Sequence, residues 1–132
     1  MASDTKHLSE HIDRPADEVY KYASDPARLP EWAPGLGTAV DKVGDQWFVE
    51  TPMGRVAFAF APPNEFGILD HDVTLPSGEV IYNPMRVAKD DTGSEVVFSL
   101  RRLPGMTDAE FERDAKAVAD DLTRLKNIVE SQ

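Results

Sequence analysis

The sequence predicts an α+β fold in which a seven-stranded, curved antiparallel sheet wraps around one long C-terminal helix. Three observations support this prediction. Apolar residues recur at helical spacing over the last part of the chain, the middle consists of short alternating runs separated by Gly and Pro, and further helix start signals occur only near the N-terminus. Connections this short cannot form the crossovers that parallel strands need, so the strands are antiparallel.

The N-terminal part contains one strand and two short helices. Residues 5–13 form the first strand, and Pro15 suits the first turn of a helix over residues 16–23. Asp25 and Pro26 supply a cap and a first-turn proline for a second helix, which ends near Trp32. Both helices therefore lie between the first and second strands.

Six further strands follow, because alternating runs are separated by turn residues such as Gly44-Asp45 and Pro76-Ser77-Gly78. Together with residues 5–13 they complete the seven strands. We place them near residues 38–43, 46–51, 55–61, 66–75, 80–88 and 95–102.

The long helix is expected from residue 107 to about residue 130. Thr107 and Glu110 make a capping box, and Pro104-Gly105 stops the segment before it. At ~1.5 Å per residue this helix is roughly 36 Å long, so it must lie across a wide sheet. Its apolar stripe consists of Phe111, Ala115, Val118, Leu122, Leu125 and Val129.

Composition indicates a single domain over residues 1–132 and limits the classes of binding partner to be expected. The chain has 24 acidic and 14 basic residues and a net charge of -10, which argues against nucleic acid and anionic membranes. Absence of cysteine excludes disulfides, thiol nucleophiles and thiolate metal sites. No apolar leader or 18-residue apolar stretch occurs, so we expect a cytoplasmic protein without stable membrane insertion.

Two stretches of the sequence resemble a known superfamily. Residues 12–34, with Ile-Asp-Arg-Pro-Ala-Asp-Glu-Val-Tyr and Ser-Asp-Pro-Ala-Arg-Leu-Pro-Glu-Trp-Ala-Pro, resemble the opening of the SRPBCC superfamily. Residues 93–100 and 103–107 are similar to its bacterial polyketide cyclase/dehydrase and lipid-transport-like subgroup. The resemblance implies the START-like helix-grip fold, with a cavity between sheet and helix. It leaves function open, because the superfamily contains carriers, cyclases, hydrolases and chaperone co-factors.

Strand alternation predicts which side chains face that cavity. Leu69 and Val73 should point inward, which forces His71 between them to point inward as well. The same argument places Asn83 and Glu10 on the inner face. Unpaired burial of such groups costs ~1 to 3 kcal/mol each, so each needs a partner, a water or a ligand. Asp70, Asp72 and Thr74 are assigned to the solvent side.

The candidate ligand-binding residues combine this polar set with apolar positions on the same faces. His71 and Asn83 would orient a ligand, although the polar groups could instead satisfy one another structurally. Trp32 could line the entrance or plug the core with Leu29 and Leu36. The complete set is Glu10, Trp32, Val56, Phe58, Phe60, Leu69, His71, Asn83, Met85, Phe98, Val118 and Leu122.

No metal and no cofactor is expected. A one-residue slip of the first strand would turn His7, His11 and Asp13 inward instead of Glu10, but this spacing is more typical of a solvated strand face. No phosphate loop, nucleophile elbow or paired-carboxylate motif occurs.

The sequence therefore favours a carrier or binder of a small hydrophobic molecule, such as a lipid, an isoprenoid or a polyketide-like ring system. The alternative is a polyketide cyclase or aromatase that uses His71 as acid or base, since histidine titrates near pH ~6.5. An adaptor for other proteins would need an exposed apolar patch, which the sequence does not indicate. The chain is expected to be a monomer, or a homodimer through the outer sheet face near Trp47 or Phe48 and Val97.

Overall fold

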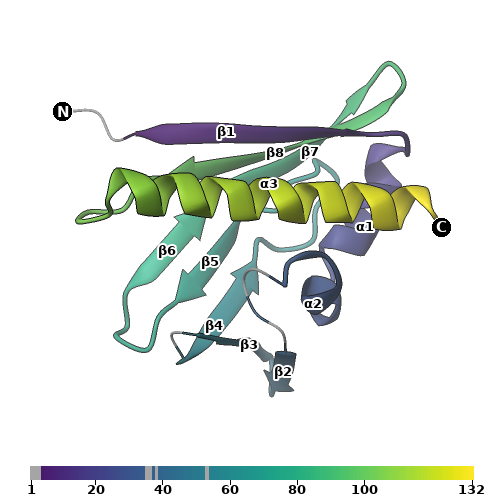
Figure 1. The fold of residues 1–132 in the computed structure, drawn as a ribbon. Helices are drawn as coiled ribbons and strands as arrows, with labels where there is room; N and C mark the ends of the chain where they lie inside the picture. Colours follow the sequence, from purple (N-terminus) through teal and green to yellow (C-terminus); the bar gives the residue numbers. More distant parts are fainter. Residues whose placement is uncertain (1–3, 35–36, 38, 53) are drawn as a thin grey trace.

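The computed structural model describes residues 4–34, 37, 39–52 and 54–132, and its elements follow the predicted order (Figure 1). The N-terminal part contains β1 (Thr5–Ile12), α1 (Ala16–Ala23), a 3₁₀ helix (Pro26–Arg28) and α2 (Leu29–Trp32). The long helix is α3 (Asp108–Glu130). Between them lie β2 (Ala39–Val43), β3 (Gln46–Thr51), β4 (Gly54–Phe60), β5 (His71–Thr74), β6 (Val80–Asn83), β7 (Met85–Asp90) and β8 (Gly93–Arg101).

The described residues form eight strands in two antiparallel sheets, so the prediction of a single seven-stranded sheet is wrong. One sheet has the order β1-β8-β7 and the other the order β2-β3-β4-β5-β6. The predicted strand over residues 80–88 is split at Pro84 into β6 and β7. Both sheets are curved and face α3, which agrees with the helix-grip arrangement (Figure 1).

The predicted strand is split because Pro84 has no backbone N–H. β5 pairs His71 with Asn83, and the same register continues to a bridge between Ile68 and Arg86. Asp70 therefore lies opposite Pro84, which has no N–H to donate to a ladder. The predicted strand 66–75 keeps regular pairing only in β5, and the segment before it forms a loop with that single bridge.

Asp70 links the two sheets by hydrogen bonds at the junction between β6 and β7, which we call the seam. The prediction that Asp70 faces solvent is wrong, because only 6 % of its surface is exposed. Its carboxylate accepts hydrogen bonds from the Met85 backbone N–H at 2.9 Å, from Arg86 Nε and Nη2 at 3.0 Å each, and from the Tyr82 hydroxyl. The hydrogen bonds from Arg86 are the main cause that lowers the pKa of Asp70 to about 2. The carboxylate is therefore ionised and satisfied at neutral pH.

The predicted capping box of α3 is confirmed. The Glu110 backbone N–H donates to Thr107 Oγ1 at 3.1 Å, and the Thr107 N–H donates to Glu110 Oε1 at 2.9 Å. The apolar stripe faces the sheets, with Val118 partly buried and the other five residues buried. Figure 1 shows the helix crossing in front of both sheets.

Polar contacts tie both ends of α3 to the sheet and its neighbouring segments; we call them the end clamps. At the N-terminal end, Arg102 pairs with Asp108, and Lys6 pairs with Glu112. At the C-terminal end, Lys126 Nζ donates to the His11 carbonyl at 2.9 Å, and Glu130 accepts from the Asp13 backbone N–H at 2.8 Å. Arg14 also donates to the Glu130 carbonyl.

The short helices close one end of the space under α3. Val19, Tyr22 and Ala23 of α1 and Leu29 and Trp32 of α2 are buried in the core. This packing follows from the apolar face that the sequence pattern predicts for each helix. Among the described residues, no helix is both long and apolar enough to cross a membrane.

Candidate functional site

A cavity of about 410 Å³ lies between the inner faces of the strands and α3. Strands β4, β5, β6 and β8 form one wall, and α2 and α3 form the others. Eight of the twelve residues that the sequence singled out contribute to it: Trp32, Val56, Phe58, His71, Asn83, Phe98, Val118 and Leu122.

The other four predicted residues lie outside the cavity wall. Leu69 and Met85 are buried in the core beside the seam. Phe60 is partly buried against the core, and its ring centroid lies 5.7 Å from that of His71. Glu10 is on the inner face of β1, but its carboxylate accepts a hydrogen bond from Thr123 Oγ1 of α3 at 3.2 Å.

His71 is enclosed by three phenylalanines. Strand register aligns it with Phe60 on β4 and with Asn83 on β6, so all three share the inner face. Its ring stacks on Phe58 at 4.9 Å with an angle of 22°, and the Phe98 centroid lies 5.7 Å away. The imidazole is thus held in one orientation by aromatic packing.

The surroundings of His71 define its protonation state. Nδ1 lies 3.0 Å from the Leu69 carbonyl oxygen, which can only accept, so the proton is on Nδ1. Burial lowers the pKa of His71, because a charged imidazolium would lose its hydration. Among the described residues, Nε2 makes no hydrogen bond. The site therefore offers a neutral imidazole with a free acceptor nitrogen.

Trp32 contributes a hydrogen-bond donor, whereas His71 contributes an acceptor. Its ring borders the cavity and packs in the same core as Leu29, while Leu36 is outside the described residues. Only 5 % of Trp32 is exposed, and its Nε1–H has no hydrogen-bond partner among the described residues. A buried donor without a partner costs ~1 to 3 kcal/mol, so a ligand acceptor that reached it would recover stability.

The structure adds polar wall residues that the sequence reasoning missed. Asp114 and Asp121 of α3 lie beside the cavity with Ala117 between them, and Arg101 joins them from the end of β8. Their spacing follows the helical period beside the apolar stripe, so a search of that face without regard to polarity would have found them. Burial raises the pKa of Asp114, whereas Asp121 pairs with Arg124 at 2.9 Å.

Several wall residues come from elements and loops with no clear periodic signal. They include Thr51, Pro52, Leu75, Leu103 and Met106. Neighbours in the chain do not predict that these side chains meet, because their positions depend on how the loops fold back over the strand ends.

The two N-terminal histidines face other partners. His7 Nδ1 lies 2.9 Å from Ser99 Oγ, and His11 lies between Asp13 and Asp90 at 2.9 Å from each carboxylate. The hydrogen bond with Asp13, followed by that with Asp90, raises the pKa of His11. In the part of the chain that the structure describes, no group of three potential ligands is arranged to hold a metal ion.

Comparison with known proteins connects this architecture to a family. A family model described as "polyketide cyclase / dehydrase and lipid transport" matches residues 7–130, which is nearly the whole chain. No curated protein matches the sequence.

Several solved structures share the fold at low sequence identity. MLL2253 from Mesorhizobium loti is 13% identical, each chain covers 98% of the other, and the TM-score is 0.73. DynU16, from the dynemicin biosynthetic locus, is 18% identical with a TM-score of 0.72; the match covers 98% of this chain and 48% of that chain. A point mutant of norcoclaurine synthase from Thalictrum flavum, bound to a transition-state analogue, is 16% identical with a TM-score of 0.63, covering 99% of this chain and 98% of that one.

Proposed function

Because the chain belongs to the polyketide cyclase/dehydrase and lipid transport family, within the SRPBCC superfamily, we propose that it binds a small hydrophobic molecule between its sheets and α3. The ligand would be a lipid, an isoprenoid or a polyketide-like ring system. The observation that supports this proposal is the cavity itself, a mostly apolar space whose wall includes the His71 imidazole, with Nε2 as a neutral acceptor. Mostly apolar pockets with a few polar groups are typical of small-molecule sites.

The size of the cavity narrows the proposed ligand. Small-molecule sites span roughly 300–1,000 Å³, and about 410 Å³ lies near the lower end of that range. The space therefore suits one compact molecule, such as a few fused rings or a single acyl chain. Phe58 and Phe98 would pack on its apolar part, and His71 Nε2 would accept a hydrogen bond from its hydroxyl group.

Filling the cavity should remove binding. Val118 lies in the wall on α3, so Val118→Trp would put an indole into the space that the ligand needs. We expect the dissociation constant for the neutral fluorescent probe N-phenyl-1-naphthylamine to rise at least about tenfold, which corresponds to ~1.4 kcal/mol. Fluorescence titration measures the constant, and native mass spectrometry of gently purified protein tests for a co-purified ligand.

Lys116→Trp is the matched control, because Lys116 lies on the exposed side of the same helix and, within the described part of the chain, its side chain pairs only with Asp120. It introduces the same indole outside the cavity and leaves the cavity empty, so probe affinity should stay at the wild-type value. Equal affinity of all three proteins, or no saturable binding by the wild type, would contradict the proposed function.

A second candidate function is catalysis in the same cavity, and the free Nε2 of His71 favours it. A neutral imidazole held in one orientation is suited to accept a proton from a bound substrate as a general base. Because burial lowers its pKa, this base would stay unprotonated below its ordinary value of 6.5. The candidate reaction is a ring closure or dehydration of the cyclase or aromatase kind.

His71→Phe separates the two candidates, since phenylalanine keeps the ring between Phe58 and Phe98 but has no acceptor. A carrier should retain the apolar probe with little change in affinity. An enzyme should lose turnover of its co-purified ligand by at least about 100-fold, the usual contribution of a general base. Mass spectrometry of the ligand over time measures turnover, and unchanged conversion by the variant would exclude His71 as the base.

A further inference from the structure

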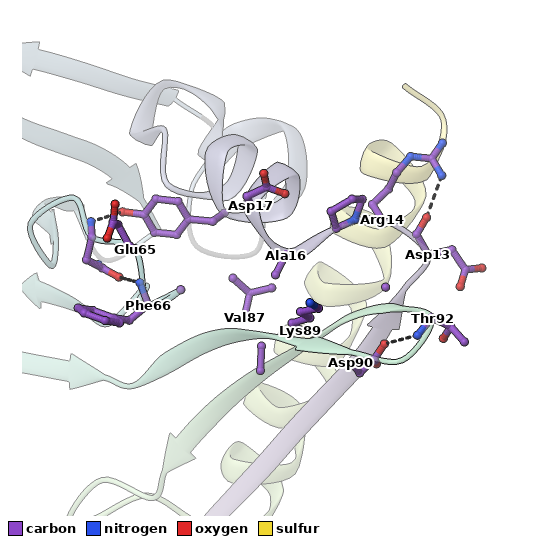
Figure 2. Close-up of a pocket in the computed structure, with 16 residues that line it drawn as sticks. Asp13, Arg14, Ala16, Asp17, Glu65, Phe66, Val87, Lys89, Asp90 and Thr92 are labelled. Atoms are coloured by element: carbon purple, nitrogen blue, oxygen red, sulfur yellow. Dashed lines mark hydrogen bonds between the residues drawn. The ribbon is translucent and has the colours of Figure 1, made fainter.

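A second hollow, the α1–β7 groove, lies on the outside of the molecule and is separate from the cavity under α3. Its volume is about 880 Å³, and it runs between the start of α1, the loop 64–67, and β7 with the turn that follows it (Figure 2). The apolar part of its wall consists of Pro15, Ala16, Tyr20, Val87 and Ala88.

Phe66 lies at one end of this groove and is 79 % exposed. The loop holds it there firmly. Asn64 Oδ1 accepts from the backbone N–H groups of Phe66 at 2.9 Å and Ile68 at 3.0 Å, and the Asn64 N–H donates to the Tyr20 hydroxyl at 3.0 Å. Exposed aromatic side chains in an ordered backbone are typical anchors of protein interfaces, because binding costs little further ordering.

Two side chains of opposite charge beside the groove, those of Glu65 and Lys89, form no ion pair within the described residues. Asp13 and Asp90 are paired with His11, and Arg14 is bonded to carbonyls at the end of α3. Among the described residues, the side chains of Glu65 and Lys89 have no ion-pair or hydrogen-bond partner. Figure 2 shows Glu65 next to Phe66 at one end, and Lys89 farther along the groove on β7.

We propose that the α1–β7 groove binds a second copy of this chain in a symmetric dimer. The anchor and the groove lie on the same face, so one two-fold rotation would place each Phe66 in the groove of the other copy. The same rotation would bring Glu65 of each copy to Lys89 of the other. The net charge of -10 and the acidic residues around the groove disfavour an anionic membrane as the occupant.

Sedimentation velocity over a range of protein concentrations tests the proposal. The wild type should form a species of twice the 14.6 kDa chain mass. Phe66→Ser should raise the dissociation constant about 30- to 1,000-fold, the range for loss of an aromatic anchor. Circular dichroism should show an unchanged fold and melting temperature of the monomer, because Phe66 makes few contacts within the chain.

Charge exchange tests the symmetric arrangement itself. Glu65→Lys and Lys89→Glu alone should each weaken the dimer about tenfold, since like charges would then face each other. The double variant Glu65→Lys/Lys89→Glu restores opposite charges and should return to within about threefold of the wild type. A wild type that stays monomeric, a dimer that survives Phe66→Ser, or a double variant weaker than either single variant would overturn the proposal. A monomer at every concentration would assign the groove to a different macromolecule.

Discussion

Asp70→Ala is expected to lower the free energy of unfolding by about 3 kcal/mol. The substitution removes the ion pair with Arg86 and leaves the buried Met85 N–H without an acceptor. An unpaired buried donor alone costs ~1 to 3 kcal/mol, and loss of a charged hydrogen bond adds ~1.5 to 3 kcal/mol. Urea unfolding monitored by circular dichroism measures the difference.

Asp72→Ala is the control, because Asp72 is an exposed aspartate of β5 two residues after Asp70, and its replacement should change stability by less than about 0.5 kcal/mol. The pH dependence gives a second check. The folded pKa of Asp70 is about 2 against an ordinary 3.8, so its stabilisation is complete above pH 3.8 and is lost as the pH falls toward 2. The difference between wild type and Asp70→Ala should shrink over that interval. A constant difference would contradict the role assigned to the carboxylate.

Among the glycines that the structure describes, Gly67 should be the most damaging to replace, and Gly67→Ala is expected to lower the free energy of unfolding by about 2 to 5 kcal/mol. Gly67 has φ +72, where a side chain costs ~1 to 2 kcal/mol, and an added Cβ would lie 2.0 Å from the Val87 carbonyl oxygen. Relief of that overlap must move the seam, at a further cost of ~1 to 3 kcal/mol. Thermal and urea unfolding measure the loss.

Gly105→Ala separates the two causes. Gly105 has φ +81 but no atom within 4 Å of an added Cβ, so only the backbone cost of ~1 to 2 kcal/mol applies. Equal losses in the two variants would show that the contact with Val87 is accommodated, and would contradict the expected rigidity of the seam.

Much of the fold could be predicted because local signals coincide with the elements. Pro15 introduces α1 over the predicted residues, and the capping box at Thr107 and Glu110 begins α3. The single sheet was wrong because alternation continues through Pro84 even though the ladder does not. Asp70 is covered by Tyr82 and Arg86 across the sheet, and such cross-strand contacts depend on register, which alternation in one strand does not reveal.

Some cavity residues could be predicted from strand alternation, whereas others depend on how α3 packs on the strands. His71 and Phe58 were placed on the inner face by strand period alone, and the structure puts both in the wall. Glu10 shares an inner face, but α3 covers it, because the helix lies directly over β1. Apolar periodicity does not predict Asp114 and Asp121 as wall residues, because charged side chains beside the apolar stripe of a helix are normally solvated.

The end clamps on α3 determine which motion could widen the cavity. Release of either end would break several ion pairs and hydrogen bonds at once, while the span around Val118 is held mainly by apolar contacts. Long helices bow at small energetic cost, because hydrogen bonds on the solvent side stretch slightly. With both ends of α3 held in this way, we expect elastic bending of its middle to be the low-energy motion that would widen the cavity.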